Sequence, residues 1–136
     1  MTRYIALTVA GALVALLCPS CVPNLHRAEM AAREASAVAA IRTIHTAEVQ
    51  YSSEYGHFAA SLADLASLID AELASGQKNG YKFSLSASGT GYQITAVPLT
   101  FNVTGARTFF SDETLTIRQN HGAEPATASS PDMQAQ

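Results

Sequence analysis

The sequence contains little charge and almost no cysteine. Charged residues occupy 14% of its 136 positions, compared with about a quarter in ordinary globular chains. The basic residues are scattered singly, so nothing in the sequence favours nucleic-acid binding. The two cysteines, Cys18 and Cys21, both lie near the N-terminus, which excludes a disulfide-stapled fold. The rest of the chain has no thiol, as is compatible with an oxidising compartment.

Motifs for catalysis are also missing. The sequence has no glycine-rich phosphate loop, no His-Glu-x-x-His motif and no pairing of cysteine with histidine. His45 and Glu48 are one helical turn apart, but two ligands are too few for a structural zinc site. We therefore expect these two residues to form a hydrogen-bonded pair on a helix surface, in a non-catalytic protein without cofactors.

The N-terminal segment is apolar. Arg3 precedes an almost wholly apolar run of about 15 residues, Tyr4–Cys18, and such a pattern is typical of a secretion signal. A membrane-spanning helix needs about 20 residues, which the run nearly reaches if it extends to Val22. We expect residues 1–23 to be a signal peptide or a membrane anchor, with the rest of the chain exported. A third interpretation is a lipoprotein signal, Leu-Leu-Cys-Pro-Ser-Cys, with the lipid on Cys21.

A long helix is predicted for residues 24–55, because no Gly or Pro interrupts this alanine-rich stretch after Pro23. At 1.5 Å per residue it would be roughly 45 Å long. The small globular part that the following residues form, here called the head, could not cover residues 24–40. The alternative is an ordinary amphipathic helix with a frayed start. Bulky residues at helical spacing in the second half are expected to pack against the head: Ile41, Ile44, Tyr51 and Tyr55. Small residues in the first half are expected to mediate self-association: Ala28, Ala32, Ser36 and Ala40.

The C-terminal half is predicted to contain a short helix and a sheet. Ser61 and Asp64 have the spacing of a capping box that would open a helix over residues 61–75. Alternation with a period of two then predicts one hairpin over 81–96 and another over 107–118, in which Leu115 and Ile117 face the same side. Residues 120–136 have no apolar rhythm and are predicted to be disordered. We thus predict an α+β fold, with the long helix packed on a small antiparallel sheet within residues 81–119.

Two stretches carry a resemblance to a known family. The first is Val-Pro-Asn-Leu-His-Arg-Ala-Glu-Met and the alanine-rich run that continues to Tyr51, and the second is Phe-Phe-Ser-Asp-Glu-Thr-Leu-Thr-Ile-Arg at 109–118. Over residues 22–119 the chain resembles type IV pilins, particularly the major pseudopilins. The resemblance implies a pilin-like domain over 24–119. It also implies a structural subunit or accessory component of a type IV pilus or type II secretion-like system in the bacterial cell envelope. Such a protein would contact the membrane and other pilin-like subunits.

The chain departs from that family in its processing site and in one turn. The family motif Gly-Phe-Thr-Leu-(Ile/Val)-Glu is absent, and residues 1–21 contain no acidic residue. Leu115 stands where the family hairpin usually has glycine. Because major pseudopilins often bind calcium in a C-terminal loop, the resemblance makes Asp112 and Glu113 candidate ligands, although calcium takes about six or more oxygens.

The alternative function is a solitary exported lipoprotein or periplasmic binding module with a pilin-derived fold.

Overall fold

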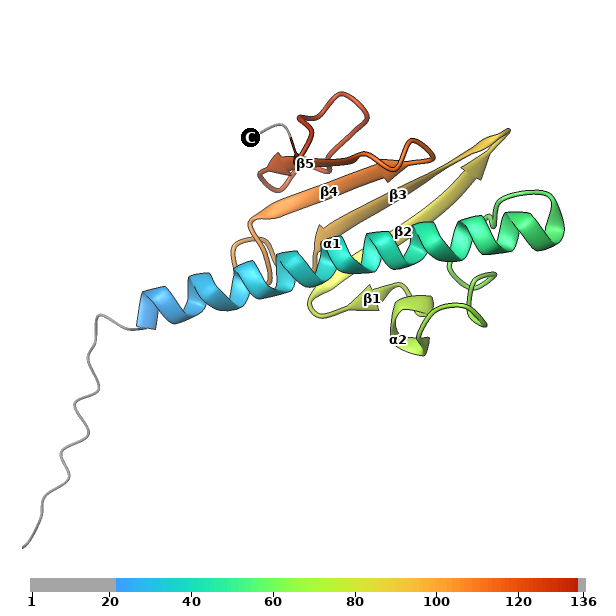
Figure 1. Ribbon diagram of the computed structural model, residues 1–136. Helices are drawn as coiled ribbons and strands as arrows, with labels where there is room; N and C mark the ends of the chain where they lie inside the picture. The colour runs from blue at the N-terminus through green and yellow to red at the C-terminus, as the bar shows by residue number, and fades with distance from the viewer. Residues whose placement is uncertain (1–21, 135–136) are drawn as a thin grey trace, which may run out of the picture.

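The computed structural model describes residues 22–134, which form one long helix and a five-stranded antiparallel sheet (Figure 1). The strands follow one another across the sheet in chain order, so the sheet is an antiparallel meander. The predicted α+β class is therefore confirmed. The elements are α1 (Val22–Tyr55), α2 (Ala71–Ala74), β1 (Gln77–Lys78), β2 (Tyr81–Ser88), β3 (Gly91–Pro98), β4 (Arg107–Asp112) and β5 (Ile117–His121).

Helix α1 begins two residues earlier than predicted and ends at the predicted residue, Tyr55. The next residue is Gly56, whose φ of 77° lies in the left-handed region that glycine adopts without strain. The Gly56 N–H donates to the carbonyl oxygen of Ser52 at 2.9 Å, which satisfies one of the last helical carbonyls. The glycine thus stops the helix and turns the chain back toward the sheet.

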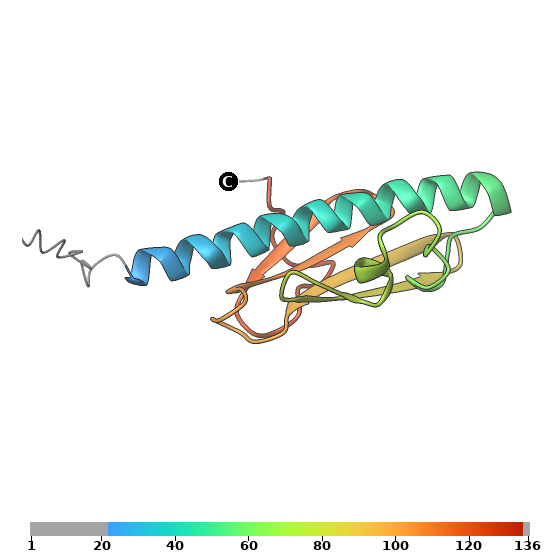
Figure 2. The ribbon, with the colours of Figure 1, turned by 90° about the horizontal axis from the view of Figure 1, so that it is seen from below.

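The helix lies across one face of the sheet, and its N-terminal turns extend past the strands (Figures 1 and 2). Residues 24–29, 31 and 32 are exposed, and the buried face begins at Glu34. The uncovered stretch is therefore shorter than the predicted 24–40, because the head reaches further along the helix than its size suggested. The buried side chains of α1 recur at helical spacing: Glu34, Ala37, Val38, Ala40, Ile41, Ile44, His45, Ala47 and Glu48.

The predicted helix over 61–75 is wrong: the chain forms a series of turns over 61–69 and then the four-residue helix α2. Ser61 and Asp64 do exchange the two capping hydrogen bonds, at 3.2 and 3.3 Å. Asp70 interrupts the continuation, because its Oδ1 accepts from Leu73 N at 2.9 Å and caps α2 as a separate helix. Apolar residues of this stretch are nevertheless buried: Leu62, Leu65, Ile69 and Leu73.

The first predicted hairpin is confirmed, and the second is displaced. Strands β2 and β3 pair along their whole length, from Tyr81 with Pro98 to Ser88 with Gly91. The second hairpin was predicted over 107–118, but its last strand, β5, starts only at Ile117, which pairs with Ser111. Leu115 lies in the turn, with a φ of 65° and 57% of its surface exposed, so the expectation that it faces the same side as Ile117 is wrong.

The described part of the C-terminal segment, residues 122–134, runs back along β5 and contradicts the predicted disorder over that range. Gln119 N donates to Pro131 O at 3.0 Å, and Met133 N donates to Ile117 O at 2.9 Å. Thr108 of β4 donates its hydroxyl to Glu124 O at 2.8 Å, and Ala126 is buried. Backbone hydrogen bonds to a strand edge order this segment without any apolar rhythm in its sequence.

Candidate functional site

A buried polar cluster joins α1 to the middle of the sheet at His45. Its Nδ1 lies 2.6 Å from the Tyr92 hydroxyl of β3, and its Nε2 lies 2.7 Å from the Ser111 hydroxyl of β4. Ser111 donates onward to Thr116 O at 2.9 Å. Since Ser111 uses its proton on that carbonyl, its oxygen accepts from Nε2–H, and Nδ1 accepts from Tyr92. All three side chains are buried and mutually satisfied.

Burial sets the protonation of this cluster. It lowers the pKa of His45 from its usual value, although the Asp112 carboxylate opposes the change. It raises the pKa of Tyr92 to about 12, with further contributions from Glu48, Glu113 and Asp112. The neutral imidazole and the neutral phenol are therefore the favoured forms. A histidine held between two hydroxyls has no free ring nitrogen for acid–base work on a substrate.

Glu48 occupies a neighbouring position on the same face of α1 and is fully buried. Its Oε2 accepts from Ala59 N at 2.9 Å, while its Oε1 has no hydrogen-bond partner among the described residues. Burial raises the pKa of Glu48; the Ala59 N–H opposes this rise and Asp64 adds to it. The side chain holds the segment after α1 against the helix. The expected surface pair of His45 and Glu48 is wrong, because each bonds to a different partner inside the head.

A second buried polar group fixes α1 to the edge of the head nearest the helix start. Glu34 Oε1 accepts from Ala106 N at 2.8 Å, and Oε2 accepts from Arg107 Nε at 2.9 Å. Arg107 Nη1 also donates to Gln119 of β5 at 2.8 Å. Tyr81 donates its hydroxyl to the Arg107 carbonyl oxygen at 2.8 Å. The contacts join α1, β2, β4 and β5, so their role is structural.

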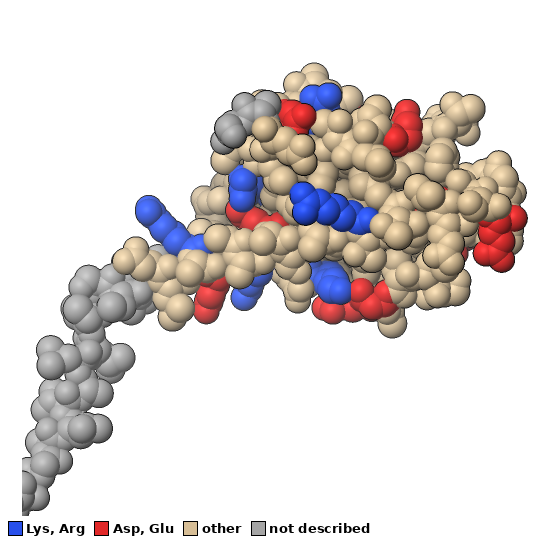
Figure 3. Space-filling view, viewed as in Figure 1, with Lys and Arg blue, Asp and Glu red and all other residues tan. Residues whose placement is uncertain are grey.

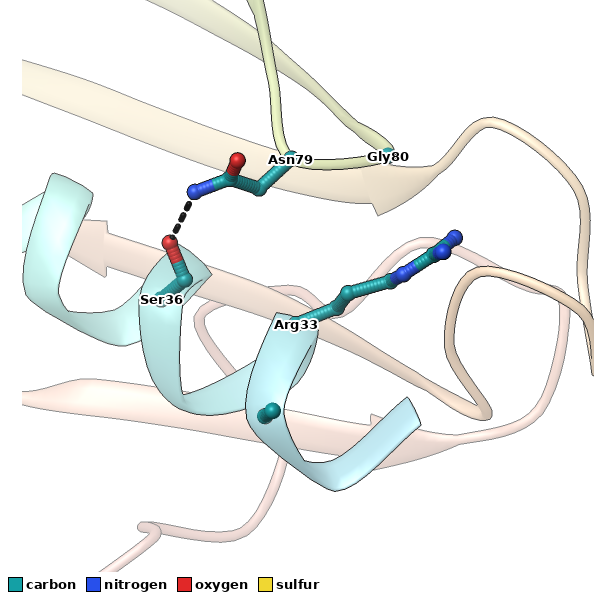
Figure 4. Close-up of a pocket in the computed structure, with 5 residues that line it drawn as sticks. Arg33, Ser36, Asn79 and Gly80 are labelled. Carbon is teal, nitrogen blue, oxygen red and sulfur yellow. Dashed lines mark hydrogen bonds between the residues drawn. The ribbon is translucent and has the colours of Figure 1, made fainter. Parts of the chain in front are cut away.

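The four small residues predicted to mediate self-association occupy three kinds of environment. Ala28 and Ala32 are exposed on the uncovered turns of α1. Ser36 accepts from Asn79 Nδ2 at 2.6 Å, beside a hollow of about 420 Å³ that Arg33 and Gly80 also line (Figure 4). Ala40 is 5% exposed within the core of the head, so its predicted role in self-association is wrong. Only Ala28 and Ala32 remain free for contact with another helix.

The residues predicted to pack on the head separate in a similar way. Ile41 and Ile44 are completely buried, as expected. Tyr51 is half-buried. The centroid of its ring lies 4.5 Å from that of Tyr55, and the His57 ring meets it edge-on at 5.7 Å. Tyr55 is 57% exposed, because the helix has by then run past the sheet, so its predicted packing on the head is wrong.

The candidate calcium ligands lie at the turn between β4 and β5. Asp112 Oδ1 accepts from Thr114 N at 3.0 Å and from the Thr114 hydroxyl, as in an ordinary Asx turn. Glu113 is exposed, and its carboxyl lies against Gly91 of the neighbouring hairpin. Within residues 22–134 no third Asp, Glu, His or Cys joins them. Calcium binding here stays a prediction with two ligands.

Two further predictions concern the membrane. The proposed lipid site, Cys21, lies outside the described residues. Among residues 22–134, no helix combines the length and apolar character needed to cross a bilayer.

On the face shown in Figure 3, acidic and basic side chains are interspersed, with no extended surface of one sign.

Comparisons with protein-family models, with curated proteins and with solved structures found no match to this chain.

Proposed function

We propose that this chain is a non-catalytic, pilin-like structural subunit or accessory component of a type IV pilus or type II secretion-like system. Residues 1–23 tether it to the membrane, and the head lies outside the cytoplasm. The N-terminal turns of α1 carry contacts with other pilin-like subunits or with a second copy.

One observation carries this proposal: over residues 24–33, the first turns of α1 bury no side chain in the head that the helix belongs to. The head is built on residues from Glu34 onward, whereas residues 24–29, 31 and 32 are exposed. A helix turn with little tertiary packing gains little stability of its own. An exposed stretch joined to an apolar segment therefore favours contact with something outside the monomer. Ala28 and Ala32 lie one turn apart, and small residues allow close approach between helices.

The inside of the head supports a non-catalytic role. The titratable side chains that it buries, His45, Glu48 and Glu34, hold helix, sheet and turns together. The hydroxyls of Tyr92 and Ser111 are occupied by the same contacts. A buried group whose polar atoms are already hydrogen-bonded within the protein has a structural role, because it has no free atom for a substrate.

Photo-crosslinking in native membranes tests the proposal. A photoreactive amino acid is placed at Ala28 in the full chain, and a matched variant carries it at Ala63, which is exposed on the turns of the head. We expect multimers or heteromeric products only from position 28. Equal products from both positions, or none from either, would contradict contact through the helix start.

Mass spectrometry of the same membrane preparation distinguishes the proposed subunit from the alternative, a solitary lipoprotein. An N-terminus that starts with a lipid-modified Cys21 would identify a solitary lipoprotein. A chain that keeps its apolar segment would agree with a membrane-tethered subunit.

A further inference from the structure

The connection between β3 and β4 forms a compact loop, residues 99–105, that its own hydrogen bonds hold in shape. Asn102 N donates to Gly105 O at 2.8 Å, and Thr104 N donates to Thr100 O at 2.9 Å. Leu99 N donates to Gly80 O at 2.9 Å, which ties the loop to the turn before β2. A side chain at Gly105 would overlap the buried Tyr81, so this position needs glycine. The loop is thus a fixed surface of the head.

This fixed loop presents large apolar side chains to solvent. Leu99 is 49% exposed, Phe101 37% and Val103 52%. Leu25, on the first turns of α1, is 61% exposed. These are four of the seven large hydrophobic side chains that are exposed within residues 22–134. Single exposed hydrophobic residues are common, but their concentration at one end of a molecule marks a contact surface.

The loop lies at the end of the head where α1 begins (Figures 1 and 2). His26 Nε2 is 3.1 Å from Asn102 O, so the loop touches the second turn of the helix. At 1.5 Å per residue, His26 is about 6 Å along the axis from Val22. The apolar run Tyr4–Cys18 ends only a few residues before that start. A bilayer that held this run would come within reach of the loop, because interfacial segments bury their apolar side chains about 5–10 Å deep.

The charges around the loop suit a phospholipid surface. Arg27 is exposed. Arg33 extends beside Gly80 (Figure 4), and a Cβ at that glycine would lie 3.4 Å from Arg33 Nη1. Neither arginine belongs to the ion pairs found within residues 22–134, which join Lys78 to Asp70 and Arg107 to Glu34. Exposed Glu29 opposes these cations, so apolar insertion is the main source of binding and the guanidinium groups add contacts to phosphate.

We propose that loop 99–105 rests on the membrane and inserts Leu99, Phe101 and Val103 into its interfacial region, beside Leu25. The inference rests on the proposed membrane tether and adds a second attachment to it. Two contacts fix the head's orientation on the bilayer, which a single tether leaves free.

A tryptophan reporter tests this contact. The chain contains no tryptophan, so Phe101→Trp in the full chain gives a single reporter in the loop. Tyr55→Trp is the matched control, since Tyr55 is also exposed but lies about 43 Å further along α1 than His26. Both variants are reconstituted into vesicles of phosphatidylcholine and phosphatidylglycerol with brominated acyl chains. We expect bromine to quench the Phe101→Trp emission at least about twofold more than that of the control.

Each outcome decides between the loop and the tether. Equal quenching of the two reporters in protein that sediments with the vesicles overturns the loop contact and leaves the tether standing. Protein that does not sediment with the vesicles overturns both. Emission from Phe101→Trp that changes with protein concentration, without bromine quenching, shows a contact between two copies and overturns the lipid proposal. If circular dichroism shows that Phe101→Trp is misfolded, Val103→Trp replaces it in the same assay.

Discussion

Glu34 of α1 and Arg107 of β4, 73 positions apart in the chain, form an ion pair in which Arg107 Nη2 lies 2.7 Å from Glu34 Oε2. The Glu34 side chain is 8% exposed and the Arg107 side chain 30%. The same carboxylate accepts hydrogen bonds from Ala106 N and from Arg107 Nε, one on each oxygen. Upstream of this contact α1 has no buried side chain among residues 24–33, although His26 still reaches the carbonyl oxygen of Asn102 in the head.

Removal of residues 1–23 is expected to leave a folded, soluble head. The buried side chains of the described chain all lie at Glu34 or beyond, so the deletion removes none of them. Circular dichroism and a cooperative thermal transition would check this. An aggregated or unfolded product would mean that the head depends on its N-terminal segment.

Glu34→Ala is expected to destabilise that head by about 2–3 kcal/mol, because it leaves Arg107 and the Ala106 N–H without their buried partner. The value is below that of a fully buried pair, since Arg107 is partly exposed. Urea unfolding measures it. Glu29→Ala removes an exposed carboxylate from the same helix and is expected to change stability by less than about 0.5 kcal/mol. If both substitutions changed the free energy of unfolding by similar amounts, the ion pair would not be a source of stability.

His45 is expected to make the head less stable in acid. Its pKa is lowered in the folded state by burial, so the unfolded chain takes up a proton at higher pH than the folded one. The stability that the neutral imidazole contributes is complete at pH values above the pKa of His45 in the unfolded chain, near 6.5. It is lost as the pH falls toward the pKa of His45 in the folded state. Urea unfolding of wild type and His45→Gln between pH 7.5 and 5 would show the difference in their stabilities shrinking as the pH falls. A constant difference would exclude the titration of His45 as its cause.

Glu48 has the opposite effect to His45, since it is expected to make the head less stable as the pH rises. Burial raises its pKa, so the folded state keeps a proton that the unfolded chain releases above about 4.5. Stability from this group is complete below that pH and is lost as the pH rises through the folded pKa. Glu48→Gln cannot ionise, so the stability of this variant relative to wild type should increase from pH 4 to 8. Thermal melts across that range measure the trend, and a flat relation would count against a buried, ionising Glu48.

Leu115→Gly is expected to stabilise the turn between β4 and β5 by about 0.5–1 kcal/mol, because a leucine in the left-handed region carries strain that glycine does not. Leu99→Gly removes a side chain of similar exposure without a positive φ and is expected to destabilise. Thermal unfolding compares the two. Leu115 lines a shallow hollow together with Val49. If Leu115→Gly also destabilised the head, the loss of this apolar side chain would outweigh the relief of backbone strain.

Local signals in the sequence predicted α1 and the first hairpin correctly. The absence of Gly and Pro after Pro23 and the alternation of Tyr81, Phe83 and Leu85 depend only on near neighbours. The sequence did not predict the displaced β5, because the pattern treated Leu115 as a strand residue, whereas the turn places it in a left-handed conformation that leucine rarely adopts. Nor did it predict order in residues 122–134, which depends on backbone hydrogen bonds to β5.

The buried polar residues were missed for a different reason. His45 and Glu48 were predicted on the helix surface, and the burial of Glu34 was not predicted, because charged and polar side chains are seldom buried without a partner. The partners of His45 and Glu34 lie far along the chain, at Tyr92 and Arg107, beyond the reach of local periodicity. A signal did exist: His45 is four residues after Ile41 and Glu48 four after Ile44, so both share the buried face.

The return of residues 131–133 along β5 constrains how two heads can meet. An uncovered strand edge offers unpaired N–H and C=O groups to the strand of another chain. Here Pro131 and Met133 already bond to Gln119 and Ile117, while the opposite edge of the sheet is the two-residue strand β1. Continuous sheets running from head to head are thereby disfavoured, and two neighbouring heads are left to join through side chains.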